Sequence, residues 1–252
     1  MEFSPYFETI IALIFFVVAF VYSSVGMGGG SSYTALMAIF GFGVSVIPMI
    51  SLTLNLFVSS IGSFNFLRNR HGRWHIIMPF LISAIPFAYL GGSLHLSKQV
   101  FLWLLLISLI VVAVRIYFWK DTGFRIELNQ RQKILISLFS GSILGLVAGI
   151  VGIGGGVYLV PLIIMLNIGS AKEAAATGAI FVWTVSLSGL ISRFQYNSVD
   201  LSEYITLILA VVAGGFLGSY MGAVKLNAKT MEKTLGVIVL LAITFLFKKI
   251  FF

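Results

Sequence analysis

The stretch Gly26-Met27-Gly28-Gly29-Gly30 interrupts a long apolar run, and it returns later in the chain as Gly152-Ile153-Gly154-Gly155-Gly156. The shift between the two stretches is 126 residues (152 − 26). Other matches follow, at the same shift or with one residue of slip: Gly43 with Gly169, Gly92 with Gly218, Ser93 with Ser219, and Gly62 with Gly189. We interpret the chain as a duplication in which each half carries one glycine-broken segment followed by three full spans.

The composition excludes a soluble protein. Hydrophobic residues fill 59% of the 252 positions and charged residues only 10%, against about 25% charged residues in soluble domains. Apolar stretches of roughly 20 residues, the length that crosses a bilayer, recur along the whole chain. We therefore predict a single all-α integral membrane domain over residues 1–252, with repeat one at about 7–119, a linker at 120–133 and repeat two at about 134–250.

The apolar segments fall into two classes by length. Two of them, Ser31–Phe42 and Val157–Leu166, are too short to cross a bilayer as helices. Each follows a glycine cluster, which is the pattern of a broken or re-entrant segment. The other eight are long enough to span: Phe7–Val25, Val46–Leu67, Trp74–Leu90, Val100–Trp119, Ile134–Val151, Ala174–Ile191, Leu201–Met221 and Thr230–Phe247.

Loop charges predict the orientation, because Lys and Arg concentrate in cytoplasmic loops. The Arg68–Arg73 loop, the linker at 120–133 and the Lys225–Lys233 loop are basic, so we place them inside. The loop around Lys98 and the Arg193–Glu203 loop then lie outside. Equivalent loops of the two halves fall on opposite sides, which predicts an inverted repeat with hairpin-like breaks and both termini outside. A parallel arrangement with spanning broken helices stays open, since Lys248 and Lys249 would lie outside.

Charge and cysteine content narrow the possible partners. The net charge of +8 comes mostly from short loops, so we expect membrane lipid and no nucleic acid as a partner. The absence of Cys removes disulfides and thiol chemistry. The segment before Ile10 contains Glu2 and Glu8 but no Lys or Arg, and we expect no cleavable signal peptide there.

The glycine clusters are the strongest functional signal. A backbone break inside a bilayer is tolerated only where it faces protein or a watery cavity, and glycine lets successive N–H groups converge into an anion-binding nest. Helix N-termini add partial positive charge. We expect small anions to bind between the two breaks, at Gly26, Gly28, Gly29, Gly30, Ser31, Ser32, Gly152, Gly154, Gly155 and Gly156. The alternative is close helix packing, since both clusters contain two glycines four residues apart.

These residues resemble a known family. The doubled Gly-x-Gly-Gly-Gly, the Pro161-Leu162 pair, the Ala176-Thr177-Gly178 stretch and Thr53-x-Asn55 are similar to the sulfite exporter TauE/SafE family over nearly the whole chain. The resemblance implies a multi-pass carrier of sulfite, sulfonates, thiosulfate or related anions in a bacterial inner membrane. The first half departs from the pattern at Ala35, which stands where the second half has Pro161.

Polar residues within the spans complete the predicted site. We expect Thr53, Asn55 and Thr177 to line the cavity, and Trp183, in mid-span, to border it. The Ser and Thr hydroxyls have an alternative in bonding to their own helix backbone, and Trp183 in packing. Arg68 and Arg193, at the ends of equivalent spans, are candidate gates that attract anions to either mouth, or alternatively interfacial side chains.

The sequence thus predicts a secondary transporter of small sulfur-containing oxyanions that works by alternating access. The alternatives are an anion channel and a carrier of another small organic anion. No catalytic residue, metal site or cofactor is expected, and the protein is not expected to be an enzyme. A coupling ion, H⁺ or Na⁺, and the oligomeric state stay open.

Overall fold

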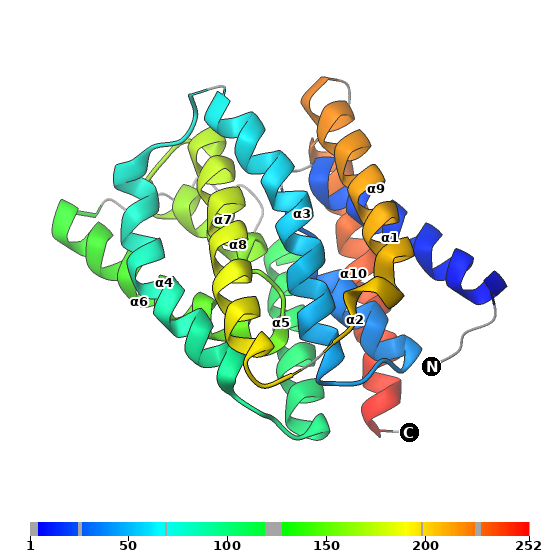
Figure 1. Cartoon of the computed structure of the whole chain (residues 1–252). Coiled ribbons are helices and arrows are strands. Elements are labelled where there is room, and N and C mark those ends of the chain that lie inside the picture. Colours follow the sequence, from blue (N-terminus) through cyan, green and yellow to red (C-terminus); the bar gives the residue numbers. More distant parts are fainter. Residues whose placement is uncertain are drawn as a thin grey trace.

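A computed structural model describes residues 5–24, 27–68, 70–118, 128–197, 199–224 and 228–251. All regular elements of the described chain are helices, and it contains no strand (Figure 1). Its elements are α1 (Pro5–Ser24), α2 (Gly30–Phe40), α3 (Val46–Arg68), α4 (Trp74–Ser93), α5 (Lys98–Phe118), α6 (Gln130–Val151), α7 (Gly156–Met165), α8 (Ala171–Phe194), the 3-10 turn η1 (Leu201–Tyr204), α9 (Ile205–Val224) and α10 (Ala228–Phe251).

Seven of these helices are long and apolar enough to cross a membrane, which confirms the all-helical membrane class. The sequence predicted eight spans. The eighth corresponds to α1, whose described apolar portion, Glu8–Ser24, falls short of a full span. The two segments predicted to be short are indeed short, since α2 has 11 residues and α7 has 10.

The helix ends follow local sequence rules. Asn129 caps α6 and Ser170 caps α8, each with a reciprocal bond from the third residue of the helix. The two short helices end alike, because Gly41 after α2 and Asn167 after α7 both adopt positive φ, the left-handed conformation that terminates helices. These two residues are also 126 positions apart (167 − 41), so the repeat extends to the way each short helix stops.

Glycines bring two pairs of helices into backbone contact. Gly141, Gly145 and Gly149 of α6 pack on the carbonyl groups of Phe80, Ala84 and Ala88 of α4. Gly214 and Gly218 of α9 pack in the same way on Phe16 and Phe20 of α1. Residue numbers rise together in both pairs, so the paired helices run parallel. Each pair joins one helix from each half of the sequence.

The contacts of α3 define the directions of the other helices. Gly62 lies against Ala179 and Leu52 against Gly189, so α3 runs antiparallel to α8. Val58 meets Gly215 and Asn65 meets Ser219, so α3 runs parallel to α9 and hence to α1. Because α1 and α3 point the same way, α2 must bring the chain back between them. These are the directions that an inverted repeat would have; the repeat itself stays a prediction.

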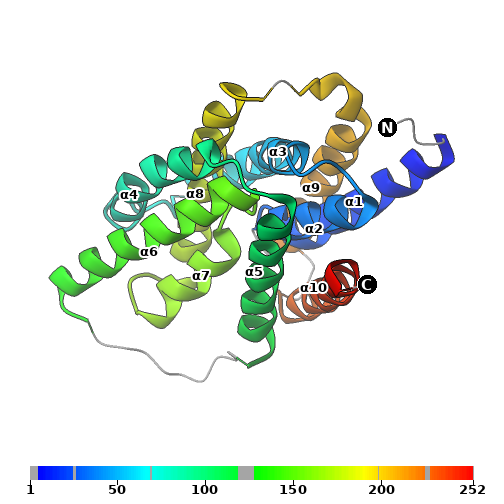
Figure 2. The ribbon, with the colours of Figure 1, turned by 90° about the horizontal axis from the view of Figure 1, so that it is seen from below.

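The buried apolar residues form two main cores. One gathers side chains mainly of α1, α2, α5, α9 and α10 together with one face of α3. The other gathers side chains of α4, α6, α7 and α8. Figure 2, which views the molecule from below, shows these two groups of helices side by side. The cores therefore do not coincide with the two halves of the sequence.

Candidate functional site

Both predicted breaks are present. One helix ends at Ser24 and the next begins at Gly30, and in the second half α6 ends at Val151 and α7 begins at Gly156. Gly29 and Gly155 stand immediately before the short helices with φ of 90° and 75°, a conformation that only glycine adopts at little cost. Gly26, which we also predicted to belong to the site, lies outside the described residues.

The two breaks meet around Asn55 of α3. A carbon atom added to Gly28 would lie 2.9 Å from Asn55 Oδ1, and one added to Gly154 would lie 2.8 Å from Asn55 Nδ2. Gly30 is so close to the other break that an added carbon would lie 2.9 Å from Gly152 O. The N-terminal ends of α2 and α7 therefore converge on one side chain, in the interior of the bundle.

Two carbonyl oxygens at this meeting point, those of Gly30 and Gly152, accept hydrogen bonds from side chains. The Ser51 hydroxyl donates to Gly152 O over 2.8 Å, and Asn55 Nδ2 donates to the same oxygen over 3.3 Å. The Thr34 hydroxyl donates to Gly30 O over 2.7 Å. These donors offset the partial negative charge of the two oxygens.

The amide N–H groups of Gly28–Ser31 and Gly154–Val157 have no hydrogen-bond acceptor within the described part of the chain. All eight of these residues are buried. Buried backbone amides are almost always paired, so two adjacent sets of unpaired amides require an explanation. An acceptor that is not part of the described chain, such as a small anion or water, would satisfy them.

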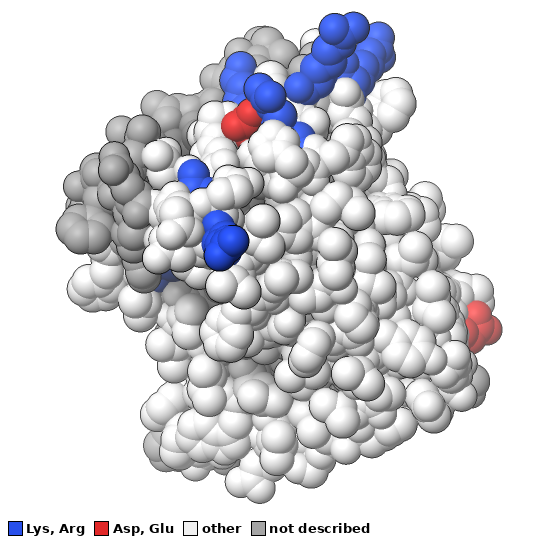
Figure 3. Space-filling view, turned by 90° about the vertical axis from the view of Figure 1, so that its left-hand side faces the viewer, with Lys and Arg blue, Asp and Glu red and all other residues white. Residues whose placement is uncertain are grey.

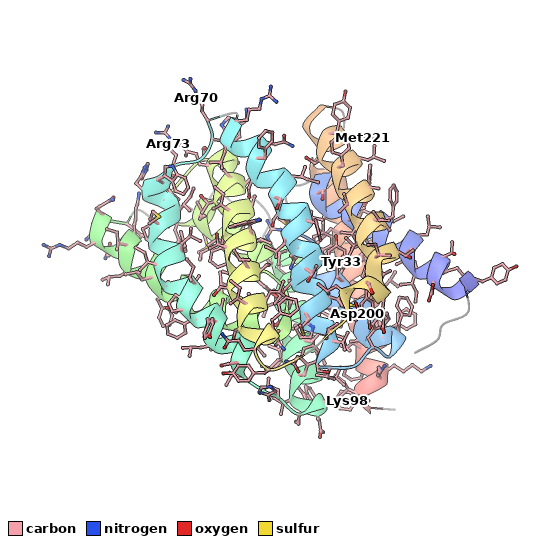
Figure 4. All side chains as sticks on the ribbon, viewed as in Figure 1. Tyr33, Arg70, Arg73, Lys98, Asp200 and Met221 are labelled. Carbon is pink, nitrogen blue, oxygen red and sulfur yellow. The ribbon has the colours of Figure 1, made fainter. Side chains whose placement is uncertain are left out.

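Side chains close to the breaks divide into satisfied and unsatisfied groups. Ser31 and Ser32, predicted as substrate donors, both hydrogen-bond with the Tyr22 hydroxyl, at 2.7 and 2.8 Å. By contrast, Tyr33 OH and Asn55 Oδ1 are buried without a described partner. Figure 4 places Tyr33 within the bundle, between Arg70 and Arg73 at one end and Lys98 at the other.

Three predicted cavity residues do not contact the breaks through their polar atoms. The hydroxyls of Thr53 and Thr177 donate to Met49 O and Glu173 O of their own helices. Trp183 is 38% exposed, and its indole N–H donates to Ser60. Its neighbour Val182 is the residue that packs against Gly28, Gly154 and Gly156. Helical periodicity alone does not distinguish two adjacent positions when the packing angle is unknown.

The two candidate gates differ in their surroundings. Arg68, in the last turn of α3, is exposed. Arg193 is only 6% exposed, and its guanidinium donates to Gly149 O and Ile150 O, at the end of α6 and just before the second break. The interpretation of Arg193 as an interfacial side chain is therefore wrong. Sequence reasoning could not locate its partners because they lie 43 and 44 residues away.

Lysines hold the opposite ends of the two short helices. Lys249 Nζ donates to Ala38 O over 2.7 Å at the end of α2, and Lys133 Nζ donates to Asn167 O over 3.0 Å after α7. A cation at a helix C-terminus stabilises the negative end of the helix dipole. Lys249, which argued against our orientation, thus has a structural role.

Sequence reasoning missed Ser51, although its spacing could have indicated it. Ser51 lies four positions before Asn55 and therefore on the same face of the helix.

The chain is similar to known membrane proteins over almost its whole length. It is 34% identical to the probable membrane transporter protein y4hK of Sinorhizobium fredii over 92% of this chain and 95% of that protein. It is 26% identical to the probable membrane transporter protein MJ0441 of Methanocaldococcus jannaschii, over 90% and 89% of the two chains. No solved structure matches.

The profile of a family described as sulfite exporter TauE/SafE matches residues 11–246. This match confirms the resemblance that the doubled glycine motif carries. Together with the seven candidate spans, it shows that the chain belongs to the sulfite exporter TauE/SafE family of membrane transporters.

Proposed function

We propose that this protein carries small sulfur-containing oxyanions, of the sulfite, thiosulfate and sulfonate class, across a bacterial inner membrane by alternating access. The observation that carries the proposal is that the amides of Gly28–Ser31 and Gly154–Val157, which have no acceptor among the described residues, converge at the N-termini of α2 and α7. The sulfur-containing class rests on the family description and not on the geometry.

The electrostatics of the site support an anion. Gly30 O and Gly152 O accept bonds from Thr34, Ser51 and Asn55, while the amides of both breaks have no acceptor in the described part of the chain. Two helix N-termini add partial positive charge without a buried Lys or Arg at the point of contact. Amides and hydroxyls such as Tyr33 OH would replace the hydration shell of the anion.

The burial of the site supports alternating access. Every described residue from Met27 to Ala35 and from Val151 to Val157 is buried, so the site is closed to both sides in this conformation. Substrate would enter only after a rearrangement that opens one side, as in transporters with broken helices. A channel would instead require a continuous path, so saturable and counter-ion-dependent flux distinguishes the two mechanisms.

The moving bodies need not be the two halves of the sequence. Glycine contacts bind α4 to α6 and α1 to α9, each across the halves. We therefore take the two cores, α4 with α6–α8 and α1–α2 with α5, α9 and α10, as the bodies that move against each other. Both bodies contact the breaks, since Met27, Ile153 and Val157 belong to the first core and Phe181 of the other core packs against Gly155.

A binding screen tests the proposal. The purified protein in detergent is heated with sulfite, thiosulfate, sulfate, taurine or acetate. We expect one sulfur oxyanion to raise the melting temperature. At a concentration one hundred times its Kd, it should increase the free energy of unfolding by about 2.7 kcal/mol. Stabilisation by acetate alone would favour the organic-anion alternative.

A matched pair of variants assigns the binding to the breaks. Gly29→Ala and Gly41→Ala introduce the same strain, because the two glycines have φ of 90° and 88°. An added carbon meets Tyr33 at Gly29 and nothing within 4 Å at Gly41. We expect only Gly29→Ala to abolish the anion-dependent shift. Equal anion binding by both variants would refute the site.

A further inference from the structure

The basic end of the molecule contains a cavity that the proposed transport site does not use. It lies between α4, α6 and the turn after α7, and has a volume of about 190 Å³. Its polar lining comes from His75, Gln130, Lys133 and Ser137, and its apolar lining includes Pro79 and Ile134. Both α4 and α6 therefore contribute polar and apolar residues to the lining.

The surroundings of the cavity carry positive charge. Arg131 and Lys172 are exposed in the first turns of α6 and α8, at the same end of the bundle. Arg73 forms an ion pair of 2.7 Å with Glu173, so this carboxylate is already paired with a cation. Figure 3 shows this face of the molecule, with Lys and Arg gathered towards one end above a broad uncharged surface.

The cavity lies at the depth expected for a membrane–water interface. His75 and Gln130 lie at the first turns of α4 and α6, next to the exposed Trp74, an aromatic anchor of the kind found at headgroup depth. One or two turns deeper, the exposed side chains of Met78 and Ile82 on α4 and of Leu135 and Phe139 on α6 are apolar. A polar recess thus opens directly above a lipid-facing surface.

We propose that this cavity binds the phosphate headgroup of an anionic phospholipid from the leaflet at the basic end of the protein. Lys133 supplies the charge, since its ammonium has three donors and uses one on Asn167 O. His75, Gln130 and Ser137 supply further polar groups. The glycerol and acyl chains pass over Pro79 and Ile134 onto the apolar faces of α4 and α6.

Free phosphate has the same charge chemistry, so the experiment separates the two sources. The melting temperature of the purified protein in detergent is measured with phosphatidylglycerol, with phosphatidylcholine of the same acyl chains, and with inorganic phosphate. We expect a concentration-dependent rise with phosphatidylglycerol alone. A rise of equal size with phosphatidylcholine or with inorganic phosphate would overturn the proposal.

Variants locate the lipid in the cavity. Lys133→Gln removes a lining charge and should weaken phosphatidylglycerol binding about fivefold, the usual contribution of one basic residue near an anionic surface. Arg131→Gln is the matched control, because it removes the same charge from the same helix at a position outside the cavity lining. Equal weakening by both variants would mean unspecific attraction and would overturn the site.

Lys133 also holds the end of α7, so Lys133→Gln could fail to fold. Ser137→Leu avoids this problem because it fills the cavity and leaves every charge in place. We expect it to lose the response to phosphatidylglycerol while its melting temperature without lipid stays within a few degrees of the parent protein. A full response in Ser137→Leu would contradict the proposal.

Discussion

Asn55 of α3 donates its side-chain amide to Gly152 O over 3.3 Å and thereby joins the first half of the chain to the break in the second half. In α3 and α8 the repeat shift is 127, as for Gly62 and Gly189, so Asn55 corresponds to Val182 (55 + 127 = 182). Val182 packs against the same two glycines as Asn55, since a carbon added to Gly28 or Gly154 would lie 2.9 or 3.1 Å from its side chain, but it has no polar group. The duplicated site is therefore asymmetric, with one amide that serves both breaks.

The first prediction concerns that amide. Asn55→Leu keeps the branching at Cγ in a larger, apolar side chain and leaves the Gly152 carbonyl with Ser51 alone, and should destabilise the protein by about 1–3 kcal/mol. Asn55→Asp adds negative charge beside the unpaired amides and should abolish anion binding at neutral pH. Thermal unfolding with and without the anion found in the screen measures both effects. Unchanged anion binding by Asn55→Asp would exclude a site at Asn55.

The second prediction concerns Arg193. Arg193→Gln removes charge-assisted bonds to Gly149 O and Ile150 O, which are buried, and should cost about 1.5–3 kcal/mol. Arg68→Gln is the control, because Arg68 is exposed at the end of α3 and its replacement should change stability by less than about 0.5 kcal/mol. Similar melting temperatures for the two variants would show that the contacts of Arg193 contribute little.

The third prediction concerns the end of α2. Lys249→Gln removes the cation that binds Ala38 O and Ile39 O and should lower stability by about 1 kcal/mol. The adjacent Lys248 is exposed, and no described carbonyl accepts a bond from it. Lys248→Gln should therefore behave like the parent protein in the same melting experiment. A larger loss in Lys248→Gln would contradict the capping role.

The fourth prediction concerns the glycine contacts between α4 and α6. Gly145→Ala would place a carbon on the carbonyl of Ala84 and force the helices apart, whereas the same change at Gly62 makes an ordinary 3.6 Å contact with Ala179. We expect Gly145→Ala to lose several °C in melting temperature and Gly62→Ala to lose none. The opposite order would mean that the pair is not in backbone contact.

The fifth prediction concerns orientation and the inverted repeat. The natural chain has no Cys, so single cysteines can be placed without background. In intact cells a membrane-impermeant maleimide should label Ser202→Cys and Gln99→Cys, and should reach Arg70→Cys and Lys172→Cys only after the membrane is permeabilised. Labelling of Arg70→Cys in intact cells would reverse the orientation. Labelling of Arg70→Cys and Lys172→Cys from different sides would contradict the helix directions.

The sequence by itself determined the membrane class, the long spans and the two breaks. These features are local, because hydropathy over about 20 residues decides whether a helix can cross a bilayer, and clustered glycines break a helix wherever they occur. The predicted duplication rests on equally local information, since it requires only a comparison of positions 126 apart.

Only the tertiary structure decided which residues surround the breaks. Ser51 and Val182 lie at the glycine clusters and Trp183 lies outside them, a choice that depends on the rotation of α3 against α8. The burial of Arg193 depends on the end of α6, 43 residues away. The pairing of α4 with α6 and of α1 with α9 exchanges helices between the halves. Such contacts are set by how close two backbones can approach in space, and a linear pattern of hydrophobicity carries no information on that.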